Sequence, residues 1–164
     1  MAGDYFPEDY KTFPFKEGDL LASKRENGKY AINKVLRIDK IVLHAGDYIN
    51  IQGQSFQAPE EDFLLIISMS YGEDEFSSLE EARKAAEKGA WKVKMGHIPN
   101  RPPGAERGQI FVGNNPVKEE KLDGYKLWKE AFIKGEAGVF NMIAPNHAFQ
   151  LTAYRGASLA AGAN

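Results

Sequence analysis

The stretch from Phe13 to Leu43 constrains the fold more than any other part of the chain. An apolar run starting at Asp19 and a longer run from Lys29 to Leu43, rich in β-branched and aromatic residues, predict two strands. The segment between them is charged and ends in Asn27-Gly28, a dipeptide that tolerates the positive φ angles of tight hairpin turns. We therefore expect an antiparallel hairpin from which a larger sheet extends.

This hairpin resembles the opening of a family of small, β-rich bacterial immunity proteins that neutralise polymorphic toxins. The similarity covers residues 13–43, where a strand opened by Gly18-Asp19 is followed by a charged turn and by a strand opened by Gly28-Lys29-Tyr30. The resemblance implies a protein that binds a toxin and does no chemistry itself. It carries over no catalytic residues.

The composition is that of an ordinary globular protein. The chain has 164 residues, of which 43% are hydrophobic and 27% charged, so it can bury a core without a disulfide or a metal. Cysteine is absent, which excludes disulfides and thiolate chemistry. The net charge of −2 gives no general attraction for phosphate backbones, and we therefore expect no binding to nucleic acid.

Neither the N-terminus nor the longest apolar run predicts a membrane segment. The first residues are acidic and aromatic, without the basic and apolar regions of a signal peptide. The run from Phe63 to Ile67 is far too short to cross a bilayer. We expect a soluble, cytoplasmic protein that does not bind membranes.

The patterning predicts an α+β fold of about eight mostly antiparallel strands with two helices packed on the sheet. The first helix, Ser78 to Lys88, begins with a Ser78–Glu81 capping box and ends before Gly89. The second begins near Asp123 and has an apolar stripe that includes Trp128. The strands are expected at residues 19–23, 29–43, 46–56, 63–67, 90–97, 109–112, 138–143 and 148–154.

We expect one domain over residues 13–154, between an N-terminal arm (1–12) and a flexible C-terminal tail (155–164). The aromatic residues of the arm either bind a partner or pack onto the protein's own sheet. A shift of 46 residues places 63–100 on 109–146, with matching helix stripes and Pro-Asn pairs. We hypothesise a duplicated strand–helix–strand unit, and the alternatives are a chance match or loop chemistry that both segments share.

The sequence contains no recognisable catalytic or metal-binding motif. Phosphate-binding loops, dinucleotide fingerprints, zinc-protease motifs and nucleophile elbows do not occur. The histidines are isolated in sequence, although His97 and His147 each lie beside a Pro-Asn pair. We predict no cofactor and no metal site.

Charged and aromatic residues predict a surface that binds another protein. Lys92 and Lys94, with Arg101 nearby, indicate a basic stripe for electrostatic docking, and the alternative is a solvated strand face. Tyr30 and Tyr48 are candidate interface anchors. We therefore expect a non-catalytic protein-binding module.

Two other functions remain open at this point. The first is a small-ligand-binding protein or a hydrolase-type enzyme, with a cleft between the two repeat units that is lined by His97, Arg101 and His147. The second is a structural subunit of a homo-oligomer, which would present an apolar, self-complementary patch.

Overall fold

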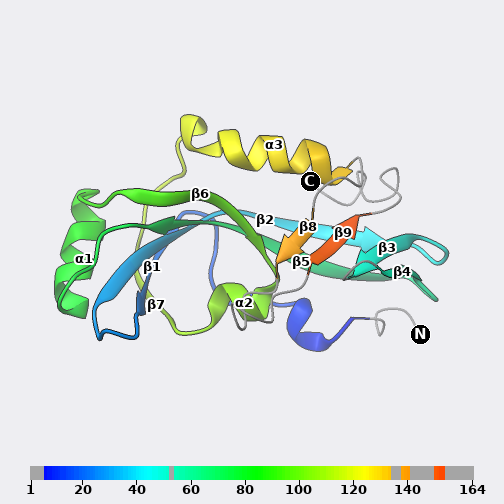
Figure 1. Cartoon of the computed structure of the whole chain (residues 1–164), viewed down its shortest axis with the longest axis horizontal. Helices are drawn as coiled ribbons and strands as arrows, with labels where there is room; N and C mark the ends of the chain where they lie inside the picture. The colour runs from blue at the N-terminus through cyan, green and yellow to red at the C-terminus, as the bar shows by residue number, and fades with distance from the viewer. Residues whose placement is uncertain (1–5, 52–53, 134–137, 141–149, 154–164) are drawn as a thin grey trace.

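The structure is a computed structural model that describes residues 6–51, 54–133, 138–140 and 150–153 (Figure 1). Its first two strands are the predicted hairpin. Strand β1 (Asp19–Lys24) pairs antiparallel with β2 (Tyr30–Leu43), and the turn between them has Gly28 at a φ of 83°. The hairpin prediction is confirmed.

Five strands form a continuous antiparallel sheet in the order β6-β5-β2-β1-β7. Strand β5 (Asp62–Gly72) lies between β2 and β6 (Val93–Asn100), and β7 (Gln109–Asn114) pairs with β1. Ile66 and Ile67 point to opposite faces of β5, yet both are fully buried. The apolar run in β5 is therefore covered on both sides.

The prediction of about eight strands with two helices is wrong. Beyond β6, four strands of only three or four residues extend the sheet in the order β8-β9-β3-β4. The run expected as one strand at 46–56 folds back on itself, because β3 and β4 pair with each other. Strand β8 joins β6 in parallel, through Asn100 and Phe140. The short strands are β3 (Tyr48–Ile51), β4 (Gln54–Gln57), β8 (Gly138–Phe140) and β9 (Gln150–Ala153).

The described residues contain three α-helices, of which α1 (Leu79–Lys88) is the one best specified by sequence. The Ser78 side chain accepts a hydrogen bond from the Glu81 backbone N–H, and Gly89 ends the helix in the left-handed conformation. Alanines on the buried face let α1 lie close to β1, β2 and β7. The predicted N-cap at Ser78 and helix end at Gly89 are confirmed, while the Glu81 carboxylate of the predicted capping box accepts its hydrogen bond from the Ser77 hydroxyl.

A short helix, α2 (Pro102–Glu106), begins with two prolines and was not among the two helices expected from the sequence. Proline fits the first turn of a helix because the N–H it lacks would have no partner there. The third helix, α3 (Asp123–Ile133), follows a 3-10 turn, Glu119–Leu122. Figure 1 shows α3 on one side of the sheet, with α2 and the N-terminal 3-10 turn, Glu8–Tyr10, on the other.

The hypothesis of a duplicated unit is also wrong. Strands β5 and β6, which flank α1, are antiparallel neighbours. Strands β7 and β8, which flank α3, lie far apart in the strand order, at the β1 side and the β6 side respectively. The matching helix stripes therefore reflect helices that each pack on a sheet, without a shared topology.

The described part of the N-terminal arm packs against the sheet. Phe6 is buried, and its backbone N–H and the Lys11 ammonium both bind the Asp62 carboxylate, the latter at 2.9 Å. Burial works against the charge of Asp62, but hydrogen bonds from Lys11, Phe6 and Phe63 lower its pKa overall. The predicted tail at 155–164 lies outside the described residues. No helix in the described ranges is long and apolar enough to cross a membrane.

We expect Gly72→Ala to destabilise the fold, because its Cβ would lie 2.5 Å from the Ile32 carbonyl oxygen and 3.1 Å from a Trp91 ring carbon. The backbone oxygen can move only if β2 shifts, so the loss should be about 1–3 kcal/mol in free energy of unfolding. Gly96→Ala is the matched control, since its Cβ would meet nothing within 4 Å. Urea unfolding of both variants measures the difference, and equal stability would contradict this packing.

Candidate functional site

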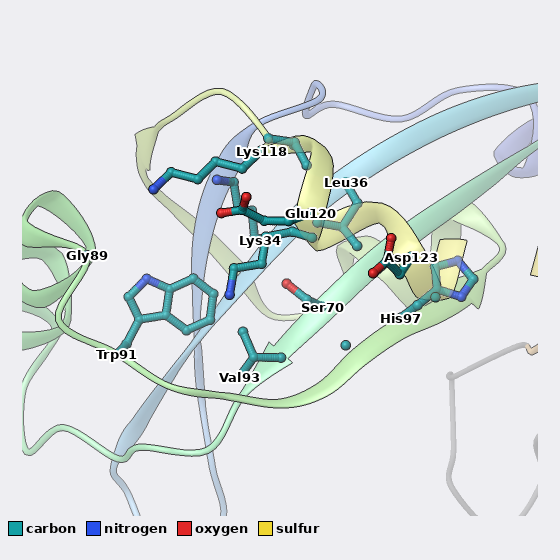
Figure 2. A pocket seen from close by; sticks show the side chains of 14 residues that line it. Lys34, Leu36, Ser70, Gly89, Trp91, Val93, His97, Lys118, Glu120 and Asp123 are labelled. Atoms are coloured by element: carbon teal, nitrogen blue, oxygen red, sulfur yellow. The ribbon is translucent and has the colours of Figure 1, made fainter. Parts of the chain in front are cut away.

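A groove of about 760 Å³ lies on the face of the sheet that carries α3, and residues of β2, β5 and β6 line it together with the segment that leads into α3 (Figure 2). Leu36 and Ser70 contribute from β2 and β5, and both are buried. Val93 contributes from β6 and is 40% exposed. The groove therefore has a mixed apolar and hydroxyl lining.

Trp91 forms a wall of the groove because α1 ends abruptly. Gly89, in the left-handed conformation, turns the chain out of the helix, and Trp91 follows two residues later. Its ring packs partly on the cluster beneath α1 and partly faces the groove. An aromatic wall of this kind suits an apolar or planar group of a ligand.

Three lysines surround the same end of the groove. Lys34 extends from β2, while Lys118 caps the N-terminus of the 3-10 turn before α3 and Lys121 lies within that turn. The Lys34 ammonium donates a hydrogen bond of 3.3 Å to the Pro116 carbonyl, which ties this segment to the sheet. Within the part of the chain that the structure describes, none of the three pairs with a carboxylate, although Glu120 also lines the groove.

The electrostatics of Lys34 reflect this crowding. Burial lowers its pKa, and the charges of Lys118 and Lys121 lower it further. A second cavity of about 450 Å³ continues from this end past Asn115; the described residues that line it include the three lysines and no acidic residue. Among the described residues, this end of the groove is therefore a cationic site in which no lysine forms an ion pair, although Glu120 lies on the groove wall.

His97 closes the opposite end of the groove. Its Nε2 lies 2.9 Å from the Ser68 hydroxyl, and Gly124 packs so closely on it that a Cβ there would lie 2.9 Å from the His97 Cβ. The rings of Tyr125 and Trp128 lie 5.9 and 5.4 Å away. Burial lowers the pKa of His97 to about 4, so the ring is neutral at pH 7.

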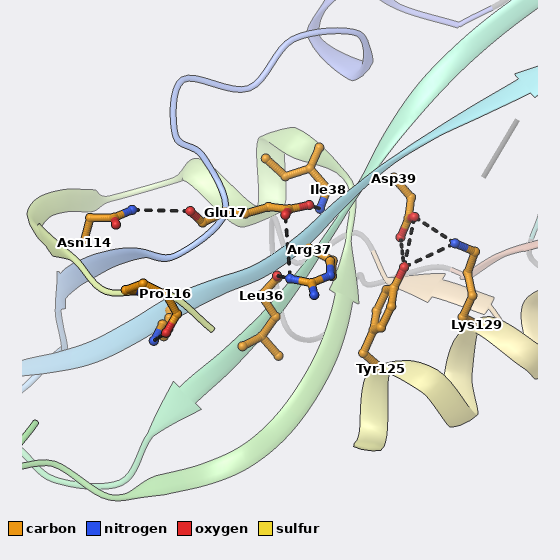
Figure 3. A network of polar contacts seen from close by, with 10 residues as sticks. Glu17, Leu36, Arg37, Ile38, Asp39, Asn114, Pro116, Tyr125 and Lys129 are labelled. Atoms are coloured by element: carbon orange, nitrogen blue, oxygen red, sulfur yellow. Dashed lines mark hydrogen bonds and ion pairs between the residues drawn. The ribbon is translucent and has the colours of Figure 1, made fainter. Parts of the chain in front are cut away.

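A buried carboxylate holds α3 in place beside the groove (Figure 3). Asp39 on β2 accepts hydrogen bonds from the Tyr125 hydroxyl at 3.0 Å and from the Lys129 ammonium at 2.9 Å. Burial opposes the charge of Lys129, but the hydrogen bond and charge of Asp39 raise its pKa overall. Burial and the same carboxylate raise the pKa of Tyr125. One turn of α3 is thus anchored by an ion pair and a phenol.

The arrangement suits binding better than reaction. Ser68 is fully buried and does not line the groove, so its bond to His97 does not present a nucleophile to a ligand. Asp39, Tyr125 and Lys129 are engaged with one another. Across the described segments, no group of three or more His, Cys, Asp or Glu side chains is placed to hold a metal ion.

The basic stripe predicted from sequence is not brought together as one surface. Lys92 and Lys94 are exposed at the start of β6. Arg101 is buried instead, with its guanidinium 4.8 Å from the centre of the Tyr10 ring, and burial lowers its pKa to about 10. Tyr30 is half-buried against the α1 cluster, and Tyr48 is half-buried on β3.

Of the three residues predicted to line the alternative cleft, the structure places one in the groove. His97 lines the groove, Arg101 does not, and His147 lies outside the described residues. Sequence reasoning missed Lys34, Trp91, Lys118 and Lys121. Only the last two had a local signal, since their three-residue spacing puts them on one side of a 3-10 turn.

No protein-family model matches this chain, and no curated protein or solved structure is significantly similar to it.

We expect the buried histidine to make stability depend on pH. An unfolded histidine has a pKa near 6.5 and His97 titrates at about 4, so the folded state binds fewer protons and loses stability as pH falls from 6.5 to 4. Between pH 7 and 5, wild type should lose about 1–2 kcal/mol more than His97→Gln in urea unfolding. His44→Gln, at an exposed position, is the control and should follow wild type. Identical pH profiles for all three proteins would contradict the burial of His97.

Proposed function

We propose that the protein is a non-catalytic binding module whose groove receives an acidic, partly apolar segment of another protein. The observation that carries this proposal is the set of Lys34, Lys118 and Lys121, which form no ion pair with any described carboxylate and surround a groove walled by Trp91. A protein partner also agrees with the resemblance of residues 13–43 to toxin-neutralising immunity proteins. The absence of cysteine is compatible with the cytoplasm, where we propose that it acts.

The physical argument is electrostatic and hydrophobic together. Neighbouring like charges disfavour the charged form of Lys34, so a carboxylate bound between the lysines would remove a repulsion as well as form ion pairs. Apolar side chains of the same segment would cover Trp91 and the exposed part of Val93. Charge would then set the association rate and selectivity, while the apolar contacts would supply most of the affinity.

A second candidate is a small-ligand binder that uses the same groove. Its volume of about 760 Å³ is within the usual range of small-molecule sites. A compact polycarboxylate could occupy the lysine end without contacting the rest of the groove. The two candidates differ in whether the apolar wall adds affinity.

We expect a labelled peptide of alternating aspartate and leucine to bind, with Lys118→Gln and Lys121→Gln each weakening binding about two- to fivefold. The loss should shrink at high salt, because these lysines are exposed to solvent. Lys92→Gln and Lys94→Gln remove the same charge outside the groove and should leave affinity unchanged. Fluorescence anisotropy gives the affinities.

Further titrations separate the candidates. Replacing leucine by serine in the peptide should weaken binding if Trp91 and Val93 are covered. Binding of citrate at least as tight as that of the peptide would favour the small-ligand candidate. If neither probe binds, or if the control lysines matter as much as Lys118 and Lys121, the groove is not the binding site.

A further inference from the structure

Strand β7 is the outermost strand of the sheet next to β1. It pairs with β1 on one side, and the strand order among the described residues places no strand on its other side. An edge strand presents a row of backbone N–H and C=O groups that a further strand can pair with. Proteins usually protect such an edge with charged side chains, prolines or bulges.

The β7 edge has little of this protection. No residue from Gly108 to Val117 is charged, and Pro116 lies beyond the end of the strand. A register shift opposite Leu20 and Leu21 interrupts the second half of the strand and leaves its first half regular. That regular half carries two exposed apolar side chains, Ile110 at 39% and Phe111 at 49%.

The sheet carries an exposed apolar side chain on each of its two faces at the β7 edge, Ile110 on one and Phe111 on the other. Ile110 lies in register with Ala22 and Phe111 with Leu21, and successive strand residues point to opposite faces. A strand added at this edge would therefore cover one apolar side chain on each face. Its own side chains at these positions would need to be apolar and uncharged.

We propose that β7 pairs antiparallel with β7 of a second copy of this chain, about a two-fold axis at Phe111. The strand itself meets the requirement, since Phe111 then lies opposite its copy and Ile110 opposite Val112, with no charge opposite a like charge. The contact joins the sheets of the two copies edge to edge. Because it is confined to one short strand, the dimer is weak and forms at tens to hundreds of micromolar protein.

Cysteine cross-linking tests the geometry directly, because the chain has no cysteine of its own. A single thiol placed at the two-fold axis meets its copy, so Phe111→Cys should form a disulfide-linked dimer under mild oxidation. Leu127→Cys is the control, since Leu127 is 71% exposed on α3, away from β7. The β7 thiol should cross-link about tenfold faster than the control, and equal rates would overturn the proposal.

Sedimentation velocity provides the second test on the unmodified chain. Wild type should shift from monomer to dimer as its concentration rises, and Phe111→Lys should remain monomeric because two lysines would then face each other. Leu127→Lys should dimerise like wild type. A monomeric wild type at hundreds of micromolar, or dimerisation that Phe111→Lys leaves intact, would overturn the pairing. Neither outcome depends on what the groove binds.

Discussion

The structure beside the groove depends on the buried carboxylate of Asp39. Asp39 is the one acidic residue of β2, and it binds both Tyr125 and Lys129 of α3. Removing one partner of a buried ion pair typically costs several kcal/mol, because the other charge is left unpaired. The ion pair therefore fixes which turn of α3 rests on the sheet. Apolar contacts, such as that of Phe132 with Ile41 and Leu64, bury the apolar surface between the helix and the sheet.

The position of α3 in turn determines the charge of the groove. The 3-10 turn before α3 carries Lys118 and Lys121, and its place follows from the contact of Gly124 with His97. The sheet contributes Lys34 from the opposite side. A cationic site is thus assembled from two segments that are more than eighty residues apart. This explains how a chain with a net charge of −2 presents a local site for anions.

Turns and helix ends could be predicted from the sequence, because the residues at those positions determine them. The Asn27-Gly28 turn and the Ser78 and Gly89 caps were predicted because side-chain and backbone preferences at those positions suffice. The number of strands was not, since the run at 46–56 shows no apolar break that would divide it, yet it forms two strands that pair with each other. The parallel contact of β8 with β6 joins residues distant in sequence, which local patterns do not reveal. The burial of Arg101 could not be predicted either, because it needs Tyr10 from the N-terminal arm. The groove lysines were missed for the same reason.

The most direct test of the account is an NMR titration of the Lys34 side chain in wild type and in Asp39→Ala, with the resonance assigned by its loss in Lys34→Met. If Asp39 holds α3 and the lysines of the preceding turn against the sheet, the pKa of Lys34 lies below 10.5 in wild type and moves back toward 10.5 in the variant. An ordinary pKa in wild type, or a lowered pKa that Asp39→Ala leaves unchanged, would contradict it.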